Sequence, residues 1–291
     1  MNRFRFSLLT ALLAPMLLIA GVLRIVARGA NWQICNGITI WFHRTLCAAL
    51  GVRVRVLGEF PRTPQTLIAA NHVSWLDIPV LGGLQSVTFL AKKEVGGHWL
   101  GRVLVNLQGV IFVDRKRRRS IPGVNREISA KLAGKAPIVL FAEATTGDGN
   151  RLLRFRSSHF EALRAVGDGD EPVLVQPLFI TYIARNGLPL GREGQPLAAW
   201  YGDMTFMSHL FRFLRDGPFD CEVALAKPIR FFRTSNRKEV ALRAQTSVRE
   251  LAVRQRRTRF QPRGPVAPPE WRPSPERACF DRIWPPTEMC D

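Results

Sequence analysis

Cysteine is scarce in this sequence, and its few copies form no recognisable site. The 291 residues include five widely spread cysteines without a C-x-x-C pair: Cys35, Cys47, Cys221, Cys279 and Cys290. An odd number without paired spacing argues against both a disulfide framework and a zinc site. A reducing compartment is the better fit, and the cysteines give no reason to expect a bound metal.

Acidic residues are also few. The chain has 23 Asp and Glu against 42 Lys and Arg, which gives a net charge of +19 and a sequence pI near 11.2. This balance predicts an anionic partner, which leaves nucleic acid, an anionic membrane surface, or an acidic carrier or substrate. No nucleic-acid-binding motif accompanies the charge, so we expect no nucleic acid. The hydrophobic fraction of 46% is ample for a folded core.

One long uncharged run stands at the amino terminus. Residues 6–23 carry no charge and are flanked by arginines. About 20 apolar residues are needed to cross a bilayer, so this run predicts either a marginal transmembrane helix or an interfacial one. A cleaved signal peptide is the rival interpretation, but no clean small-residue cleavage site follows the run.

A second apolar stretch covers residues 32–50. Its apolar residues fall on one broad helical face, and Trp32 and Trp41 suit the headgroup level of a membrane. We therefore predict that residues 1–50 form a pair of membrane-associating helices. The alternative for the second stretch is a helix packed on the domain core.

Short apolar runs rich in branched residues follow Gly51 and alternate with helical or turn-rich segments. These runs read VRVRVLG, TLIAA, GVIFV, PIVLF and VLVQPLFITY. The alternation predicts an α/β fold. We expect one catalytic domain over residues 51–232, followed by a basic, proline- and arginine-rich C-terminal extension over residues 233–291.

The segment NHVSWLD, residues 71–77, places an ionisable pair in otherwise apolar chain. Residues five apart in one helix do not share a face, so we expect the helix to begin just after His72, with Asp77 reaching back from it. A carboxylate bonded to one ring nitrogen leaves the other as a base toward a hydroxyl. The alternative is a buried histidine that takes part in no reaction. A serine hydrolase using Ser74 is disfavoured because these residues are too close along the chain and no G-x-S-x-G elbow exists.

Three further motifs follow this pair in order. They are GVIFVDR (109–115), FAEATTGDG (141–149) and VQPLFI (175–180), and each follows or lies in a predicted strand. With NHVSWLD, the set resembles the glycerolipid acyltransferase family. The resemblance implies an acyltransferase-type mixed sheet flanked by helices. It also implies transfer of an acyl group from an acyl carrier protein or coenzyme A thioester to the hydroxyl of a lysolipid, without a metal or prosthetic group.

The resemblance assigns roles to single residues. His72 would be the general base and Asp77 would orient it. Arg115 and Glu143 would bind the acceptor headgroup, with a close backbone approach at Gly109. The remaining assignments, by the same resemblance, are acceptor binding for Thr145 and Thr146 and acyl-donor binding for the block around Pro177.

Departures in the third motif bear on the acceptor. Ala142 and Ala144 stand where proline and glycine are usual, and Thr146 stands where a phosphate-binding arginine is common. Asp148 adds a carboxylate, which disfavours a phosphate and suits an amine. The segment also looks like the branch that acylates lyso-ornithine lipid, which we favour.

Lysophosphatidate remains the alternative acceptor, supported by the arginines of residues 151–156. The basic run at residues 115–119 suits an acidic carrier protein, a thioester donor or anionic headgroups. The expected location is the bacterial cytoplasmic membrane, with the catalytic domain on the cytoplasmic side.

Overall fold

The computed structural model describes residues 32–61, 65–92, 110–113, 118–134, 136–166 and 171–258. The apolar run at residues 6–23 lies outside these described residues, and so do Gly109, Arg115 and residues 259–291. What the sequence predicts for these positions stays a prediction.

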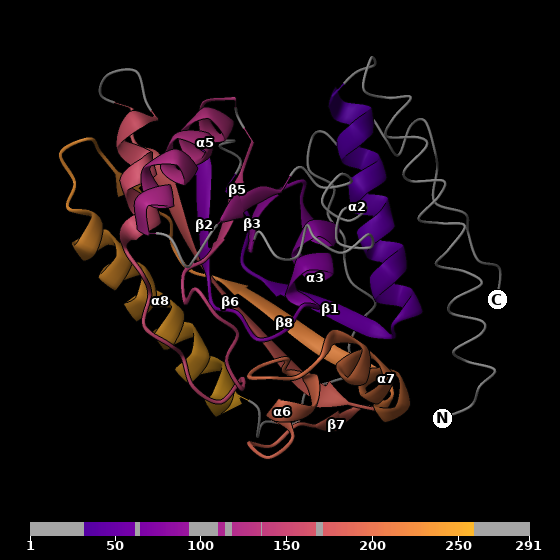
Figure 1. Ribbon diagram of the computed structural model, residues 1–291. Helices are drawn as coiled ribbons and strands as arrows, with labels where there is room; N and C mark the ends of the chain where they lie inside the picture. Colours follow the sequence, from indigo (N-terminus) through magenta and orange to yellow (C-terminus); the bar gives the residue numbers. More distant parts are fainter. Residues whose placement is uncertain are drawn as a thin grey trace.

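Nine strands and several helices alternate along the described chain (Figure 1). The strands are β1 (Val52–Leu57), β2 (Thr66–Ala70), β3 (Thr88–Lys92), β4 (Ile111–Val113), β5 (Ile138–Phe141), β6 (Val173–Arg185), β7 (Leu188–Pro189), β8 (Phe219–Leu225) and β9 (Ile229–Phe231). The helices are α2 (Trp32–Ala49), α3 (Asp77–Leu84), α5 (Ile121–Ala133), α6 (Gln195–Ala198), α7 (Phe206–Asp216) and α8 (Arg237–Thr258), with the 3-10 helices η3 (Arg118–Ser120) and η4 (Ser158–Ala165).

The strands form one mixed, mostly parallel sheet in the order β1-β8-β6-β2-β5-β3-β4. Strand β2 pairs in parallel with β5 and β6, and β3 pairs in parallel with β5 and β4. Strands β7, β8 and β9 run antiparallel to β6, while β1 is parallel to β8. The predicted α/β fold with a mixed sheet flanked by helices is therefore confirmed.

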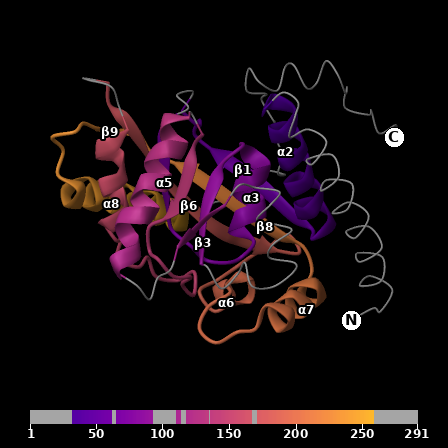
Figure 2. The same ribbon diagram turned by 45° about the horizontal axis from the view of Figure 1, so that its top comes forward.

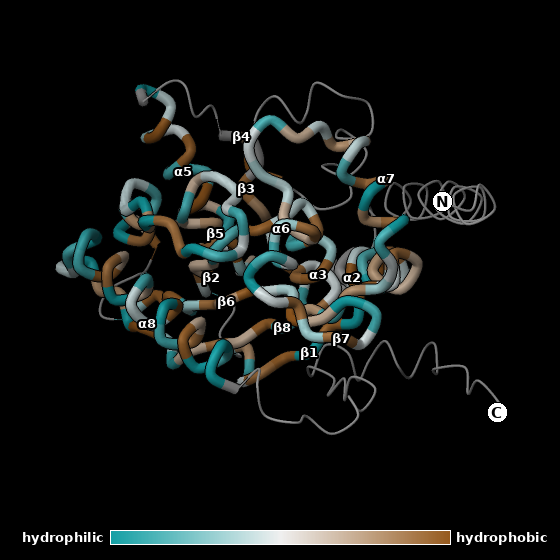
Figure 3. Tube along the Cα trace, turned by 90° about the horizontal axis from the view of Figure 1, so that it is seen from below, coloured by the Kyte–Doolittle hydropathy of each residue, from teal (hydrophilic) through white to brown (hydrophobic). Residues whose placement is uncertain are grey.

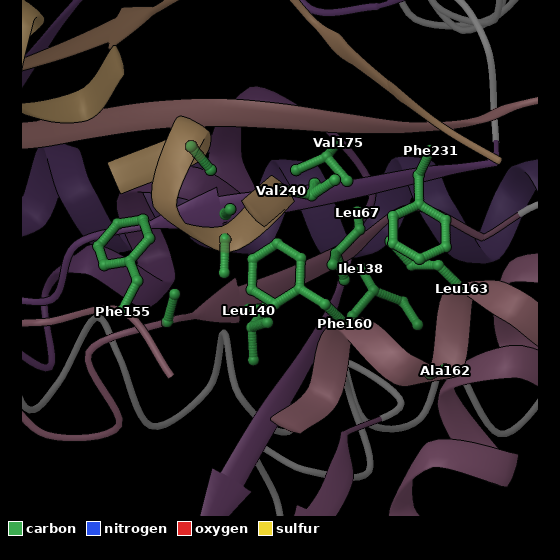
Figure 4. Close-up of a cluster of buried hydrophobic side chains, with 14 of the residues drawn as sticks. Leu67, Ile138, Leu140, Phe155, Phe160, Ala162, Leu163, Val175, Phe231 and Val240 are labelled. Carbon is green, nitrogen blue, oxygen red and sulfur yellow. The ribbon is translucent and has the colours of Figure 1, made fainter. Parts of the chain in front are cut away.

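The central strands β2, β5 and β6 are buried on both faces because they are apolar at successive positions. In β2, Leu67 and Ala69 belong to the core beneath α5, η4 and α8, while Ile68 and Ala70 belong to the core beneath α2 and α3. Figure 1 shows these two groups of helices on opposite sides of the sheet. In the first core, Phe160 of η4 lies among the strand side chains (Figure 4).

Helix α8 is part of the first core. Its buried apolar side chains are small and recur along one face, so that the helix lies close to the sheet. They are Val240, Ala241, Ala244, Val248 and Ala252. The turns of α8 that face away from the sheet are hydrophilic (Figure 3). Helix α8 thus lies in the expected C-terminal extension, after Phe232, but contributes these five side chains to the core of the catalytic domain.

Helix α2 packs on the other face, against α3. Phe42 and Cys47 are buried, and Nε of Arg44 donates to the carbonyl of Gly83 at 3.0 Å. The second apolar stretch therefore forms a helix that packs on the domain, which was the alternative interpretation of this stretch. Trp41 faces outward and is 41% exposed. Within the described part of the chain, no helix is long and apolar enough to cross a membrane.

Short elements close one end of the molecule. Figure 1 shows α6 and α7 near β7, and Figures 1 and 2 show both helices at the end away from α5. Thr205 caps α7, since its side chain accepts the N–H of Ser208. Phe213 of α7 stacks on Phe219 of β8 with ring centroids 4.5 Å apart, which fixes the helix on the sheet.

Candidate active site

The loop between β2 and α3 carries the histidine and the aspartate of the first motif. Strand β2 ends at Ala70 and α3 begins at Asp77, so the expectation that the helix begins just after His72 is wrong. The N–H of Asp77 donates to the carbonyl of Ser74 at 3.1 Å, and this turn delays the helix. Pro79 then falls in the first turn of the helix, where the backbone N–H groups have no acceptor within the helix, so that proline, which lacks an N–H, is tolerated. The loop lies at the carboxyl end of a parallel strand, where open α/β sheets bind ligands.

His72 and Asp77 are in direct contact. Nδ1 of His72 lies 2.8 Å from Oδ2 of Asp77, whose side chain is 0% exposed, while the imidazole is 13% exposed. The ring stacks on Phe141 with centroids 3.9 Å apart, which restricts its rotation. An ionised Asp77 can only accept hydrogen bonds, so Nδ1 carries the proton and Nε2 keeps a lone pair. Nε2 can then take a proton from a hydroxyl.

Further donors surround the Asp77 carboxylate. Oδ2 also accepts the N–H groups of Val73 at 2.7 Å and Ser74 at 3.0 Å. Oδ1 accepts the hydroxyl hydrogen of Tyr182 at 2.9 Å. A buried negative charge needs such donors to offset the loss of water, and these hold it next to the imidazole.

Glu143 supports the histidine from the segment after β5. Its Oε2 accepts the N–H of His72 at 2.8 Å, and its Oε1 accepts the N–H of Leu153 at 2.6 Å. The side chain is buried, and burial raises the pKa of Glu143 from 4.5 to about 7. The nearby Asp77 charge adds to this rise in pKa, while the two backbone hydrogen bonds oppose it. Both oxygens of Glu143 are therefore engaged with backbone groups.

The backbone of the loop is fixed by two other segments. The N–H of Gly147 donates to the carbonyl of His72 at 2.9 Å, and the N–H of Trp200 donates to the carbonyl of Val73 at 2.9 Å. The third motif therefore contacts His72 on both of its backbone groups. Such fixation holds the reacting group in place before substrate arrives.

The other third-motif residues lie beside this loop. Thr145 is exposed and Thr146 is half-buried. Oδ1 of Asp148 accepts the N–H groups of Asn150 and Arg151 at 2.9 and 3.2 Å, which forms a local turn.

Ala144 has a backbone φ of 61°, in the left-handed region that glycine adopts freely. This conformation gives a physical reason for the glycine usual at that position.

Pro177 lies within the sheet rather than in the loop. It pairs with Ala69 of β2, and its carbonyl accepts the N–H of Ala226 at 3.1 Å. Gly109 and Arg115 are outside the described residues. In the described parts of the chain, no group of three or more His, Cys, Asp or Glu side chains could hold a metal ion.

Sequence reasoning missed two residues that hold the loop. Asn71 exchanges hydrogen bonds with the backbone of Ile180, donating to its carbonyl at 2.9 Å and accepting its N–H at 2.8 Å. Tyr182, on the same strand, reaches Asp77. A polar residue directly after a buried strand was the available signal for Asn71. For Tyr182 the only signal was a hydroxyl at the end of an apolar run.

A histidine oriented by a buried carboxylate, at the carboxyl edge of an α/β sheet, defines an enzyme site that removes a proton from a nucleophile. Residues 51–181 match the family model described as Acyltransferase. The lyso-ornithine lipid O-acyltransferase of Rhizobium meliloti is 40% identical over 231 residues, or 78% of this chain and 79% of that protein. The chain therefore belongs to the acyltransferase family.

Other relatives differ in how much of the chain they match. The lyso-ornithine lipid O-acyltransferase of Brucella abortus is 37% identical over 72% of this chain and 80% of its own length. The 1-acyl-sn-glycerol-3-phosphate acyltransferase of Neisseria meningitidis is 35% identical over 44% of this chain and 50% of its own. A solved structure, the 1-acyl-sn-glycerophosphate (LPA) acyltransferase PlsC from Thermotoga maritima, superposes with a TM-score of 0.57 at 20% identity. It covers 87% of this chain and 98% of that one, and so shares the fold.

Proposed function

We propose that this protein transfers a fatty acyl group from a thioester donor to the hydroxyl of lyso-ornithine lipid. The observation that carries the proposal is the extent of similarity. The lyso-ornithine lipid O-acyltransferases match 72% to 78% of the chain, whereas the 1-acyl-sn-glycerol-3-phosphate acyltransferase of Neisseria meningitidis matches 44%. The additional matched length includes segments outside the shared motifs, where acceptor preference can differ.

The chemistry follows from the His72 geometry. Nε2 of His72 takes the proton of the acceptor hydroxyl as the oxygen attacks the thioester carbonyl carbon, forming the new C–O bond. The resulting imidazolium is stabilised by the adjacent Asp77 carboxylate. When the C–S bond breaks, the departing thiolate takes the proton back from Nε2, so the base is regenerated.

The remaining site residues act around this centre. Glu143 fixes the position of His72 through its backbone N–H and thereby shapes the acceptor side of the site. Arg115, Thr145 and Thr146 bind the acceptor headgroup, and Gly109 gives room for it. The block at Pro177 borders the acyl donor.

The donor is acyl carrier protein or a coenzyme A thioester, since both carry the anionic groups that a chain of net charge +19 attracts. The same charge favours an anionic membrane surface, to which residues 1–50 attach the enzyme. In this arrangement α2 packs on the domain with one face, and its exposed Trp41 faces the membrane. The proposed location is the cytoplasmic face of the bacterial inner membrane, where these donors occur.

The test is an assay of the purified enzyme with one labelled acyl-carrier thioester and two lysolipids at equal surface concentration. Transfer to lyso-ornithine lipid in preference to lysophosphatidate is expected. Strong transfer to lysophosphatidate with none to lyso-ornithine lipid would reject the acceptor and leave the reaction type standing.

His72→Ala in the same assay tests the mechanism. Loss of the base should lower turnover by about 10²-fold or more while the protein stays folded. His159→Ala is the matched control, because that ring pairs with Asn125 on α5 and should leave turnover unchanged. Full activity in folded His72→Ala would remove the proposed mechanism.

A further inference from the structure

The two oxygens of the Asp77 carboxylate have different partners. Oδ2 accepts from the His72 ring and from the N–H groups of Val73 and Ser74. Oδ1 accepts from the hydroxyl of Tyr182 at 2.9 Å. The side chains of Asp77 and Tyr182 are both fully buried. A carboxylate can rotate about its Cβ–Cγ bond, so a donor fixed on Oδ1 determines which oxygen faces the imidazole.

The position of Tyr182 follows from the sheet register. Ala70, the last residue of β2, pairs with Leu178 of β6. Strand β6 continues to Arg185, so its later residues run beside the loop that follows β2. Side chains of alternate residues share one face of a strand. Ile180 thus meets the start of the loop and Tyr182 meets its end, so one strand holds both ends of the motif.

Packing alone does not require this hydroxyl. Tyr182 lies in an apolar cluster with Phe141 and Ile180, where a phenyl ring would fill nearly the same volume. Burying a hydroxyl there is unfavourable unless it finds a partner. Burial and the Asp77 charge raise the pKa of Tyr182 well above 10, so the hydroxyl keeps its proton and remains a donor.

We propose that Tyr182 is a positioning residue for acyl transfer, which orients the Asp77 carboxylate and, by sharing its charge, sets how strongly His72 holds a proton. This inference rests on the proposed function, because it needs a measurable reaction. Removing the donor concentrates negative charge on the oxygen that faces His72. The histidine should then become more basic and less well oriented.

Other titratable groups face this pair. Cys47 of α2 and Cys221 of β8 interact electrostatically with Tyr182. Burial raises the pKa of Cys47 to about 12 and raises the pKa of Cys221 well above its usual value. Both thiols therefore stay neutral between pH 5 and 9. Glu143 interacts with Asp77 from the segment after β5. Asp220 and Glu222 of β8 act on Cys221. The variants below keep all of these groups, so any effect of their titration is the same in the wild type and in the variant.

The experiment measures kcat/KM of the full-length enzyme against pH with a labelled acyl-carrier thioester and lysolipid acceptors. For Tyr182→Phe we expect kcat to fall roughly tenfold, with the KM values nearly unchanged. The acid limb of kcat/KM should move upward by about 0.5 to 1 pH unit. Tyr201→Phe, at the only other tyrosine of the chain, should leave kcat and the limb unchanged.

A second variant keeps the shape of the ring. Site-specific replacement of Tyr182 by 3-fluorotyrosine makes the phenol a stronger donor, so the acid limb should move downward instead. An unchanged limb in folded Tyr182→Phe, even with a lowered melting temperature, overturns the inference because a structural role alone gives that result. If Tyr182→Phe does not fold, an unshifted or upward-shifted limb in the fluorotyrosine protein overturns it. Failure of the unmodified enzyme to acylate either lysolipid overturns the proposed function instead.

Discussion

Replacing Glu143 by glutamine should change how stability depends on pH. Glu143 is 5% exposed, and burial raises its pKa from 4.5 to about 7. A raised pKa in the folded state means that the protonated side chain is the better accommodated form. Its contribution to stability is therefore complete below about pH 4.5 and is lost as the pH rises through 7. The rise of about 2.5 units in pKa corresponds to about 3 kcal/mol.

Glutamine has nearly the same shape and does not titrate. The free energy of unfolding of the wild type, minus that of Glu143→Gln, should therefore fall by about 3 kcal/mol between pH 4.5 and 8. Urea denaturation at a series of pH values measures both quantities, and other titrating groups cancel in the difference. A difference that stays level or rises across this range would refute the reasoning.

The same substitution should lower turnover. Above pH 7 the Glu143 carboxylate accepts the N–H groups of His72 and Leu153, whereas an amide offers one acceptor oxygen. Losing one hydrogen bond to a charged group, about 1.5 kcal/mol, corresponds to roughly a tenfold lower kcat if the His72 backbone shifts. Glu161→Gln changes a half-buried carboxylate on η4 that pairs with Arg164 and Arg237, and it should retain full turnover.

Two further substitutions test the surroundings of the loop. Burial, aided by the Arg212 charge, lowers the pKa of His209 to about 4, and its Nδ1 accepts from Nε1 of Trp75 at 3.0 Å. The free energy of unfolding of the wild type should therefore fall by about 3 kcal/mol as the pH falls from 6.5 toward 4. In urea denaturation, His209→Gln should remove this dependence on pH. Ala144→Gly should stabilise the protein by up to about 1 kcal/mol in the same measurement, because φ is 61° there; a loss of stability would contradict the strain argument.

The fold was predictable where burial is continuous along the chain. Strands β2, β5 and β6 match continuous apolar runs of the sequence, and the His72–Asp77 contact follows from the motif. Strand β8 was missed because Asp220 and Glu222 are buried within it, and Asp220 is paired with Arg53 of β1 at 2.5 Å. Only the tertiary fold places that partner, so no local pattern could indicate the strand.

Helix α8 and the residues that support the His72 loop could not be predicted from the sequence for other reasons. The inward face of α8 consists largely of alanine among arginines, so its composition resembles a solvated extension. The contacts of Asn71 and Tyr182 depend on how far β6 extends beyond β2, and this is a property of register. Periodicity gives the face on which a strand residue lies, but not which residue lies opposite it on a neighbouring strand.

The four residues between His72 and Asp77 have a physical reason in this loop. The carbonyl of Ser74 accepts the N–H of Asp77, and this turn carries the Asp77 side chain back over the N–H groups of Val73 and Ser74. The imidazole lies one residue further back and reaches the same oxygen. Because each helical residue turns the side chain by about 100°, moving the aspartate by one position would aim its carboxylate away from all three donors. The spacing thus lets one oxygen orient the base and also hold the loop that carries it.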